Sequence, residues 1–262
     1  MKYILKMFEN FYNRRELLVE LVRRDLKLKY RRSFLGYLWS TLNPLLLTVV
    51  MALVFTNMFK RNIDNFPVYL MTGNLFFSFM RDATTQSLRS ITNNAALLKK
   101  VYVPKYIFTL ATVTSGLVNL VLSFGALIIV MLATGVPFTW YALLSIIPLL
   151  QLYVFCVGLS LFLAQATVFF RDIQNIWSVV VTAWMYLTPV FYPLEAMPAM
   201  LQWAVPKFNP MYIYITQFRD FVLYGTMTWD ELLIRGAFVA ALMLAIGIWF
   251  FRRSQHKFIL YI

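Results

Sequence analysis

Residues 106–170 form a run of 65 positions that contains no Asp, Glu, Lys or Arg. A soluble domain does not accommodate such a run, because about a quarter of its residues are charged. A membrane-spanning helix, by contrast, needs about 20 predominantly apolar residues. The run is too long for one span, and the Gly and Pro of segment 134–139, "TGVPFT", predict a turn between two spans. A chain with this run belongs in a lipid bilayer.

The whole chain has the composition of a membrane protein, with 61% hydrophobic and 13% charged residues. Residues 33–59 again lack charge at 27 consecutive positions, and a second apolar stretch begins at Phe66 and reaches Arg81 and Asp82 near the inner interface. We therefore predict an all-α integral membrane protein with one domain and six transmembrane helices. The predicted spans are residues 33–59, 66–90, 106–133, 140–168, 173–192 and 232–251 of the 1–262 domain.

Basic residues indicate the orientation of these spans. Six spans place both termini on one side, which would hold 19 Lys and Arg residues, against five on the other side. Lys and Arg accumulate on the cytoplasmic side of membrane proteins, so both termini are predicted to be cytoplasmic. The formal net charge of +13 then reflects topology and attraction to anionic lipid, not the binding of nucleic acid.

The N-terminal segment, residues 1–32, is predicted to form a cytoplasmic amphipathic helix. Apolar side chains recur there at spacings of three and four, and charged side chains occupy the other side. The apolar positions are Leu17, Leu18, Leu21, Val22, Leu26 and Leu28, and the charged ones are Glu16, Glu20, Arg23, Arg24, Lys27 and Arg31. Such a helix lies along the membrane surface, either as an ordinary interfacial anchor or with its basic face toward a partner.

Residues 193–231, between the fifth and sixth spans, are aromatic and apolar but repeatedly interrupted by proline. The prolines are Pro193, Pro198, Pro206 and Pro210, and each continuous piece between them is too short to cross a membrane. Short apolar pieces of this kind are typical of re-entrant or interfacial half-helices. The alternative is a plain outer loop that adheres to the headgroups.

The sequence offers no catalytic group of its own. The single cysteine, Cys156, falls within the fourth predicted span, and the single histidine, His256, lies in the basic tail, so neither a zinc site nor a Ser-His triad is expected. No "GK" dipeptide of a Walker A loop occurs. Energy for uphill transport would come from another polypeptide or an ion gradient. An ion-coupled carrier is disfavoured, because four of the spans lack charged residues over their cores.

Several motifs, in order along the chain, resemble one family of transporters. "RRDLKLKYRRSFLGYLW" and "NPLL" come first, followed by "NNAALLKKVYVPKYIF", "VFFRDIQNIW", "LTPVFYPLEAMP" and "FNPMYIYITQFRDFVLYG". Together they resemble the ABC-2 type permeases that export lipid-linked polysaccharides, such as the O-antigen and teichoic acid exporters. The resemblance covers essentially the whole chain.

The resemblance implies a homodimer in the plasma (inner) membrane of a bacterium, bound to two copies of a separate ATPase subunit. ATP and Mg would then bind the partner subunit, and this chain would carry no cofactor. The expected function is export of an undecaprenyl-linked cell-surface glycan, such as O-antigen of lipopolysaccharide or cell-wall teichoic acid. The alternatives are an ABC-2 permease for small molecules or drugs, and a membrane scaffold for glycan synthesis.

The resemblance also implies where the ATPase subunit binds. The amphipathic helix resembles the family's interface helix, and residues 97–104 resemble its gate or coupling helix. The expected interface residues are Arg23, Arg24, Asp25, Leu97, Leu98, Lys99, Lys100, Val101, Tyr102, Pro104, Arg171 and Asp172. For the "RD" pair at 171–172, a salt bridge at a helix terminus is the structural alternative.

Aromatic side chains are the expected lining of the substrate path. A polysaccharide has apolar C–H faces that flat aromatic rings contact without requiring one fixed geometry. Because the first and fifth spans line the channel in the family, the candidates are Tyr37, Trp39, Trp177, Trp184, Tyr186, Phe191 and Tyr192. The alternative role for each is in the belt of Trp and Tyr at the membrane interface.

Overall fold

The computed structural model describes residues 15–31, 33–59, 63, 65–100, 103–227 and 231–258, and its regular elements are all helical. This confirms the predicted all-α class for the described residues. The longer helices are α2 (Arg15–Tyr30), α3 (Trp39–Phe59), α4 (Phe66–Ser87), α6 (Tyr106–Thr134), α7 (Ile146–Phe169), α8 (Ile173–Tyr186) and α11 (Glu231–Ser254). The shorter ones are η1 (Gly36–Leu38), η2 (Thr92–Asn94), α5 (Ala95–Lys100), η3 (Trp140–Ser145), η4 (Leu194–Ala196), α9 (Ala199–Phe208), α10 (Pro210–Arg219), η5 (Asp220–Tyr224) and η6 (Gln255–Lys257).

Within the described residues, four helices are long and apolar enough to cross a membrane. They are Gly36–Phe55, Tyr106–Thr134, Trp140–Phe169 and Glu231–Lys257. Two of the six predicted spans, residues 66–90 and 173–192, are not among these four helices. Helix α4 carries Arg81 and Asp82 and is less apolar, whereas α8 has only 14 residues, or about 21 Å, against a hydrocarbon core of about 30 Å.

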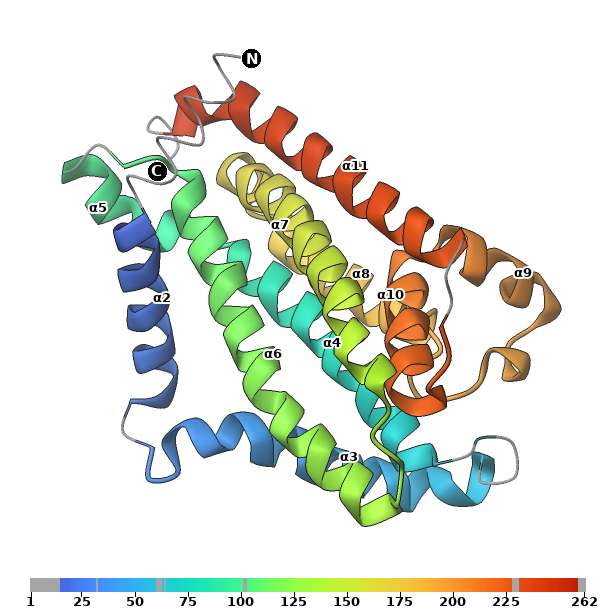
Figure 1. Ribbon diagram of the computed structural model, residues 1–262. Coiled ribbons are helices and arrows are strands. Elements are labelled where there is room, and N and C mark those ends of the chain that lie inside the picture. Colours follow the sequence, from blue (N-terminus) through green and yellow to red (C-terminus); the bar gives the residue numbers. More distant parts are fainter. Residues whose placement is uncertain are drawn as a thin grey trace.

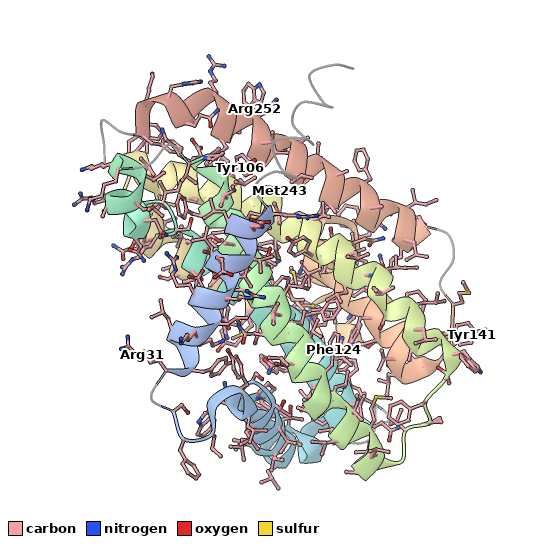
Figure 2. The ribbon with its side chains drawn as sticks, turned by 60° about the vertical axis from the view of Figure 1, so that its left-hand side comes forward. Arg31, Tyr106, Phe124, Tyr141, Met243 and Arg252 are labelled. Atoms are coloured by element: carbon pink, nitrogen blue, oxygen red, sulfur yellow. The ribbon has the colours of Figure 1, made fainter. Side chains whose placement is uncertain are left out.

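Helices α4, α6 and α7 run between two opposite ends of the molecule, whereas α3 lies across the lower end in the view of Figure 1. Figure 2 shows Tyr106 and Arg252 near one end and Tyr141, at the connection of α6 to α7, near the other. At the first end α6 begins, α7 ends and α11 ends, and contacts such as that of the Phe169 ring with the Phe258 ring hold them together. The exposed cations Lys99 and Lys100 of α5 belong to this end.

Helix α4 is the most enclosed of the long helices. Val68, Met71, Phe76 and Met80 are fully buried, and α4 packs against α3, α6, α7 and α10. The Phe76 ring lies 4.2 Å from the ring of Phe218 on α10. Because other helices surround α4, its polar residues need not face lipid, which explains how a less apolar helix occupies the centre of the bundle.

Helices α7 and α11 cross at an unusually short separation, and they lie side by side in Figure 1. A Cβ atom on Gly158 would lie 2.4 Å from the main-chain oxygen of Met243, and one on Gly247 would lie 2.1 Å from the oxygen of Gly158. Small residues at such a crossing let two helix backbones pack directly against each other, which is a common source of affinity between membrane helices.

The segment between α8 and α11 consists of short helices, as its prolines predict. Helices α9 and α10 have ten residues each, too few to cross a bilayer. Pro210 is the first residue of α10, and the side chain of Asn209 caps this helix by accepting from the amides of Met211 and Tyr212. A π-helical turn, η5, continues α10 and ends at Gly225, whose φ is +58°.

Candidate functional site

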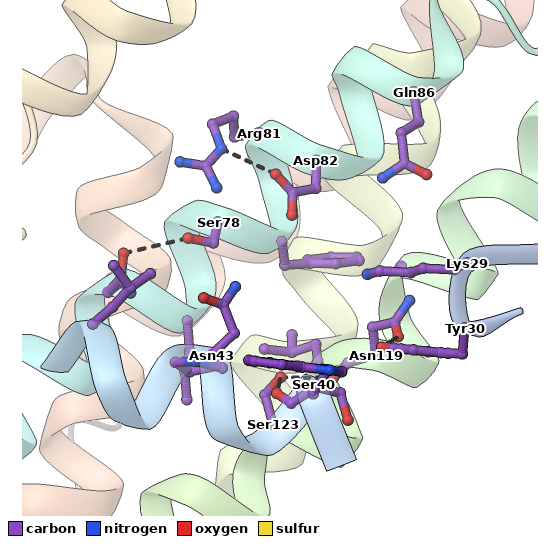
Figure 3. Close-up of a pocket in the computed structure, with 18 of the residues that line it drawn as sticks. Lys29, Tyr30, Ser40, Asn43, Ser78, Arg81, Asp82, Gln86, Asn119 and Ser123 are labelled. Atoms are coloured by element: carbon purple, nitrogen blue, oxygen red, sulfur yellow. Dashed lines mark hydrogen bonds and ion pairs between the residues drawn. The ribbon is translucent and has the colours of Figure 1, made fainter. Parts of the chain in front are cut away.

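A polar cavity of about 400 Å³ lies between the α2–α3 connection, α4 and α6 (Figure 3). Its polar lining residues are Lys29, Tyr30, Ser33, Ser40, Asn43, Asn74, Ser78, Arg81, Asp82, Gln86, Asn119 and Ser123, and its aromatic ones include Trp39 and Phe79. For a chain that is 61% hydrophobic, this is a dense collection of hydroxyl and carboxamide groups. The cavity is therefore the leading candidate for a binding site.

A proline in α3 helps to build one wall of this cavity. Pro44 has no amide hydrogen, so the carbonyl of Ser40 loses its usual partner within the helix. The Ser123 hydroxyl of α6 donates to that carbonyl at 2.8 Å. On the neighbouring turn of α6, Asn119 accepts from the Tyr30 hydroxyl at 2.7 Å. These two bonds hold the start of α3 and the end of α2 against the middle of α6.

Other polar groups in the cavity remain available to a ligand. Among the described residues, the carboxamides of Asn43 and Gln86 form no hydrogen bond, and the Asn74 carboxamide bonds only to the Ser78 hydroxyl. Asn43 points toward the cavity from α3, and Gln86 points toward it from α4 (Figure 3). Both side chains belong to exposed residues, so a molecule outside the bundle can reach them.

One ion pair marks the α4 side of the cavity. The Arg81 Nε donates to Asp82 Oδ1 at 3.0 Å, and both side chains are nearly half exposed. Together with the ammonium group of Lys29, the pair places charge beside the carboxamides. Amide and hydroxyl groups beside a partly exposed indole ring can bind a polar, hydroxyl-rich molecule reversibly, and no covalent chemistry is needed for such binding.

The two aromatic candidates at the start of α3 lie at the surface. Trp39 lines the cavity and is 43% exposed, whereas Tyr37 is 52% exposed and packs its ring 4.8 Å from the Tyr30 ring. Both rings are thus partly available to a ligand. Of the seven aromatic candidates, Trp39 is the one that the structure combines with the polar lining of the cavity.

The tryptophans of α8 turn inward, toward the bundle. Trp177 is only 7% exposed and its indole N–H donates to Thr84 of α4 at 3.2 Å, while that of Trp184 donates to Asn209 at 2.8 Å. The exposed side of α8 is formed instead by Ile176, Val179, Val180, Tyr186 and Leu187. In a single copy of the chain, the Trp177 ring is therefore covered and presents no face to a conduit.

The three remaining aromatic candidates lie at the far end of α8. Tyr186 is 62% exposed, and its carbonyl accepts from the Tyr192 hydroxyl. The ring of Phe191 stacks with that of Phe55 on α3, with centroids 6.3 Å apart. Tyr186 is thus the α8 aromatic residue with the most accessible ring, and Phe191 links this end of α8 to α3.

Helices α2 and α5, which carry most of the predicted ATPase-binding residues, contribute to one apolar cluster. Leu97 and Leu98 pack beside Leu21 against Ile107 and Phe108 at the start of α6. Helix α2 therefore lies along the first part of α6, with its apolar side against protein (Figure 1).

The charged members of the predicted interface face outward. Arg24 donates to Asn94 at 3.0 Å and to Asp25, Arg23 pairs with Glu20, and Lys99 and Lys100 are exposed. Pro104 lies before α6, whereas Val101, Tyr102 and residues 1–14 are outside the described residues.

Arg171 and Asp172 lie in the exposed turn between α7 and α8. Neither forms an ion pair with a described residue, and the Asp172 side chain does not cap α8. The suggested salt bridge at this helix terminus is therefore wrong for the described part of the chain. The start of α8 is instead connected to the turn that follows α4, because the Arg89 Nε donates to the Gln174 side chain at 2.7 Å.

The polar cavity itself was not predicted from the sequence. A detectable signal was present, since Ser40 and Asn43 lie three positions apart, Asn74 and Ser78 four apart, and Asn119 and Ser123 four apart. Polar residues at these spacings share one face of a helix. Which faces meet depends on the packing of α3, α4 and α6, so the spacing alone does not place them in one cavity.

Residues 16–223 match the family described as ABC-2 type transporter. The chain belongs to this ABC-2 type transporter family. This ABC-2 chain is 36% identical over 192 residues to the O-antigen export system permease protein RfbA of Myxococcus xanthus, covering 73% of this chain and 74% of that protein. It is 27% identical over 256 residues to a protein of the same name from Klebsiella pneumoniae, covering 97% and 98% of the two chains.

A further relative of this ABC-2 chain comes from a different polysaccharide system. The capsule polysaccharide export inner-membrane protein CtrC of Neisseria meningitidis serogroup A is 28% identical over 200 residues, which cover 74% of each protein. The relatives from three bacteria are thus similar to this chain over most or nearly all of its length.

Proposed function

We propose that this chain is the membrane-spanning permease subunit of an ATP-driven exporter of cell-surface polysaccharide. The observation that carries the proposal is the similarity, over almost the full length of both chains, to a protein named as an O-antigen export permease. The cavity supports it, because carboxamides, hydroxyls and the Trp39 ring suit the hydroxyls and C–H faces of sugars. The substrate would be a lipid-linked glycan of the O-antigen, capsule or teichoic acid type.

The conduit in this proposal forms between two copies of the chain. One copy presents an exposed surface on α8 and an open polar cavity beside α3 and α4. A homodimer with twofold symmetry would bring the corresponding surfaces of two copies together around one path. Trp39, Asn43 and Tyr186 would then line the path, whereas Trp177 and Trp184 would support α8 from behind.

The energy in this proposal comes from two copies of a separate ATPase subunit. ATP and Mg would bind that subunit, which would contact the cytoplasmic end of this chain at α2 and α5. Because α2 and α5 share the Leu21 cluster with the start of α6, a push on α5 would reach α6 through packed side chains. ATP binding would thereby bias a membrane domain that has two conformations.

The membrane topology in this proposal has six crossings, with both termini in the cytoplasm of a bacterium and the chain in its inner membrane. The four long apolar helices supply four crossings. Helix α4 would be the second, shielded from lipid by its neighbours, and α8 with the turn that follows it would be the fifth. The short helices α9 and α10 would be half-helices on the outer side.

Cysteine labelling tests this topology. Cysteines placed at Trp140 and Lys207, both exposed, are expected to react with a membrane-impermeant maleimide in cells whose outer barrier has been permeabilised. Cysteines at Lys100 and His256 are expected to react only after the inner membrane is opened. Reaction at His256 in sealed cells would contradict a cytoplasmic C-terminus.

A purified complex tests the function itself. The chain is copurified with its cognate ABC ATPase subunit and reconstituted in liposomes, and this complex is expected to hydrolyse ATP faster when lipid-linked glycan is present. The glycan should also become accessible on the opposite side of the bilayer. Stimulation by small hydrophobic drugs but not by glycan would favour a drug-efflux permease, and binding of glycan without ATP-dependent movement would favour a scaffold for glycan synthesis.

The Trp39→Ala variant tests the cavity. Removing a stacking ring is expected to cost about 1 kcal/mol of glycan contact, and export per folded complex should fall about fivefold. Adding Asn43→Leu removes a free carboxamide from the same cavity and should lower export further. The matched control is Trp249→Ala on α11, because Trp249 is similarly exposed but lies outside the cavity. Equal export by the two tryptophan variants would contradict the assigned cavity.

A further inference from the structure

Arg219 is a buried charge in the apolar segment that follows α8. It is the last residue of α10, at the junction with the π-helical turn η5, and it is only 5% exposed. Ionisable residues at membrane depth are costly and usually have a specific function. A π-helical turn next to such a residue is a further common mark of a functional position.

The guanidinium group of Arg219 binds three main-chain carbonyls. Its Nη1 donates to Pro189 at 2.9 Å, and its Nη2 donates to Tyr69 at 3.1 Å and to Val190 at 3.2 Å. The same group lies 3.4 Å from the centre of the Tyr69 ring. Gly73 leaves room for this arrangement, because a Cβ there would lie 2.6 Å from Nη2.

These contacts offset part of the cost of burying the charge without a carboxylate, while the buried Nε has no hydrogen-bond partner among the described residues. Among the described residues, no Asp or Glu forms an ion pair with Arg219. Carbonyl dipoles and an aromatic face are weaker partners than a carboxylate, but together they satisfy most of a guanidinium in a site of low polarity. The geometry is specific, since one side chain connects α4, the turn after α8 and α10.

The same turn is bound by two other side chains. Asn209 donates to the carbonyl of Leu187 at 3.1 Å, and the Tyr69 hydroxyl donates to the carbonyl of Tyr192 at 3.0 Å. Residues 187–192, which we call the outer turn of α8, are therefore bonded through their main chain to α4 and α10. Thr188, Pro189 and Val190 within the turn are buried.

The other end of α8 forms fewer hydrogen bonds with its neighbours. Among the described residues, the first two turns of α8 form two side-chain hydrogen bonds to this region. One runs from Arg89, in the turn that follows α4, to Gln174, and the other from Trp177 to Thr84 of α4. One side of α8 carries no cover in this chain along its whole length, from Ile176, which is 56% exposed, to Tyr186, which is 62% exposed, so the difference between the two ends lies in their hydrogen bonds. Helix α8 is thus anchored at its outer end and comparatively free at its inner end.

We propose that Arg219 is a positioning residue that keeps the outer turn of α8 bound to α4 and α10 throughout the transport cycle. Movement of α8 then originates at its inner end, and the outer turn moves only together with α4 and α10. The proposal rests on the proposed function, in which α8 forms part of the conduit wall.

Cysteine reactivity in the assembled complex tests this proposal. A Val190→Cys substitution places a thiol in the turn, at a position that is 0% exposed. The thiol is expected to resist maleimide both without nucleotide and with the ATPase trapped in its ATP-bound state. In Arg219→Met, which keeps a long side chain but loses the donors, its labelling rate should rise about tenfold or more. The native Cys156, which is fully buried, should stay unlabelled.

Two further variants keep the test independent of one substitution. Gly73→Ala serves as the positive control, because its Cβ would lie 2.6 Å from Nη2 and 3.3 Å from the Cα of Val190, so it should displace the turn directly and raise labelling at position 190. Arg219→Lys keeps a charge but lacks the planar fork that reaches several carbonyls, so its effect should be intermediate. A rise in Gly73→Ala without any rise in Arg219→Met would overturn the proposal, as would labelling of Val190→Cys in the ATP-bound state.

Transport measurements separate positioning from general stability. In Arg219→Met, ATP hydrolysis by the assembled complex should continue, while export per ATP hydrolysed should fall severalfold, because the conduit wall is displaced from its outer support. Simultaneous labelling of Cys156 would show that Arg219 stabilises the whole bundle, which would overturn the positioning role. The labelling needs no glycan, so it stands or fails separately from the assignment of polysaccharide as substrate.

Discussion

A Gly158→Leu subunit is expected to be almost absent from the membrane. The side chain would have to occupy space held by the backbone of α11, since even a Cβ at this position would lie 2.4 Å from the Met243 oxygen and 2.5 Å from the Leu244 nitrogen. Backbone atoms cannot rotate away as a side chain can, so the two helices would have to separate along their whole contact. We expect a loss of about 3 kcal/mol or more in the free energy of unfolding.

Alanine variants provide the finer measurement for this crossing. Gly247→Ala should also be destabilising, because its Cβ would lie 2.1 Å from the Gly158 oxygen. Gly125→Ala on α6 is the matched control, since its nearest neighbour, Thr41, would be 3.5 Å away, an ordinary contact. The comparison is the apparent Tm of the purified subunit in detergent. Equal Tm values for the Gly247 and Gly125 variants would show that α7 and α11 are not packed as closely as the structure indicates.

Reversing the charge of Lys99 and Lys100 together is expected to weaken binding of the ATPase subunit strongly. Both residues are exposed in the last turn of α5, where their charge complements the carboxyl end of the helix. Their neighbours Leu97 and Leu98 fix α5 to α2 and α6, so the cations are held on a defined surface. Two Glu residues there should weaken binding about a hundredfold, because like charges at an interface repel and close charge pairs contribute several kcal/mol.

The measurement is copurification of the ATPase with tagged permease, together with export. Reversal of Arg253 and Lys257 to Glu is the control, since these cations are also exposed at the same end of the molecule but on the C-terminal segment. Normal copurification and export by the Lys99 and Lys100 variant would reduce residues 97–104 to an ordinary basic loop. Loss in both variants would point to attraction by the overall positive charge instead of a specific surface.

The membrane class and the helical architecture were predictable from the sequence, because the bilayer imposes one-dimensional requirements. The length of an uncharged run and the position of its flanking charges determine whether it can cross, and both are read directly from residues 106–170 or 33–59. The short helices between α8 and α11 were likewise predictable, because Pro198 and Pro210 stand where α9 and α10 begin, although Pro206 lies inside α9.

Which helices are enclosed by others and which have an exposed side was not predictable in the same way. The predicted spans appeared equivalent, yet α4 is enclosed on most sides and α8 is a helix of 14 residues with one exposed side. The sequence gives the residue type of each aromatic side chain of α8 but not the direction in which it faces. Residue type alone does not distinguish an indole that packs against α4 from a ring that lines a conduit. Trp177 and Tyr186 carry similar chemistry and face different surroundings.

By itself, the sequence determined that this protein is a helical membrane protein with a strongly basic end. These properties depend on composition and spacing along the chain. Only the tertiary structure decided that Asn43, Gln86 and Asn119 share one cavity, and that Arg219 binds the carbonyls of Tyr69 and Pro189 across separations of 150 and 30 residues. Such contacts depend on how the helices rotate and cross, which is set by the simultaneous packing of many side chains and leaves no local pattern in the sequence.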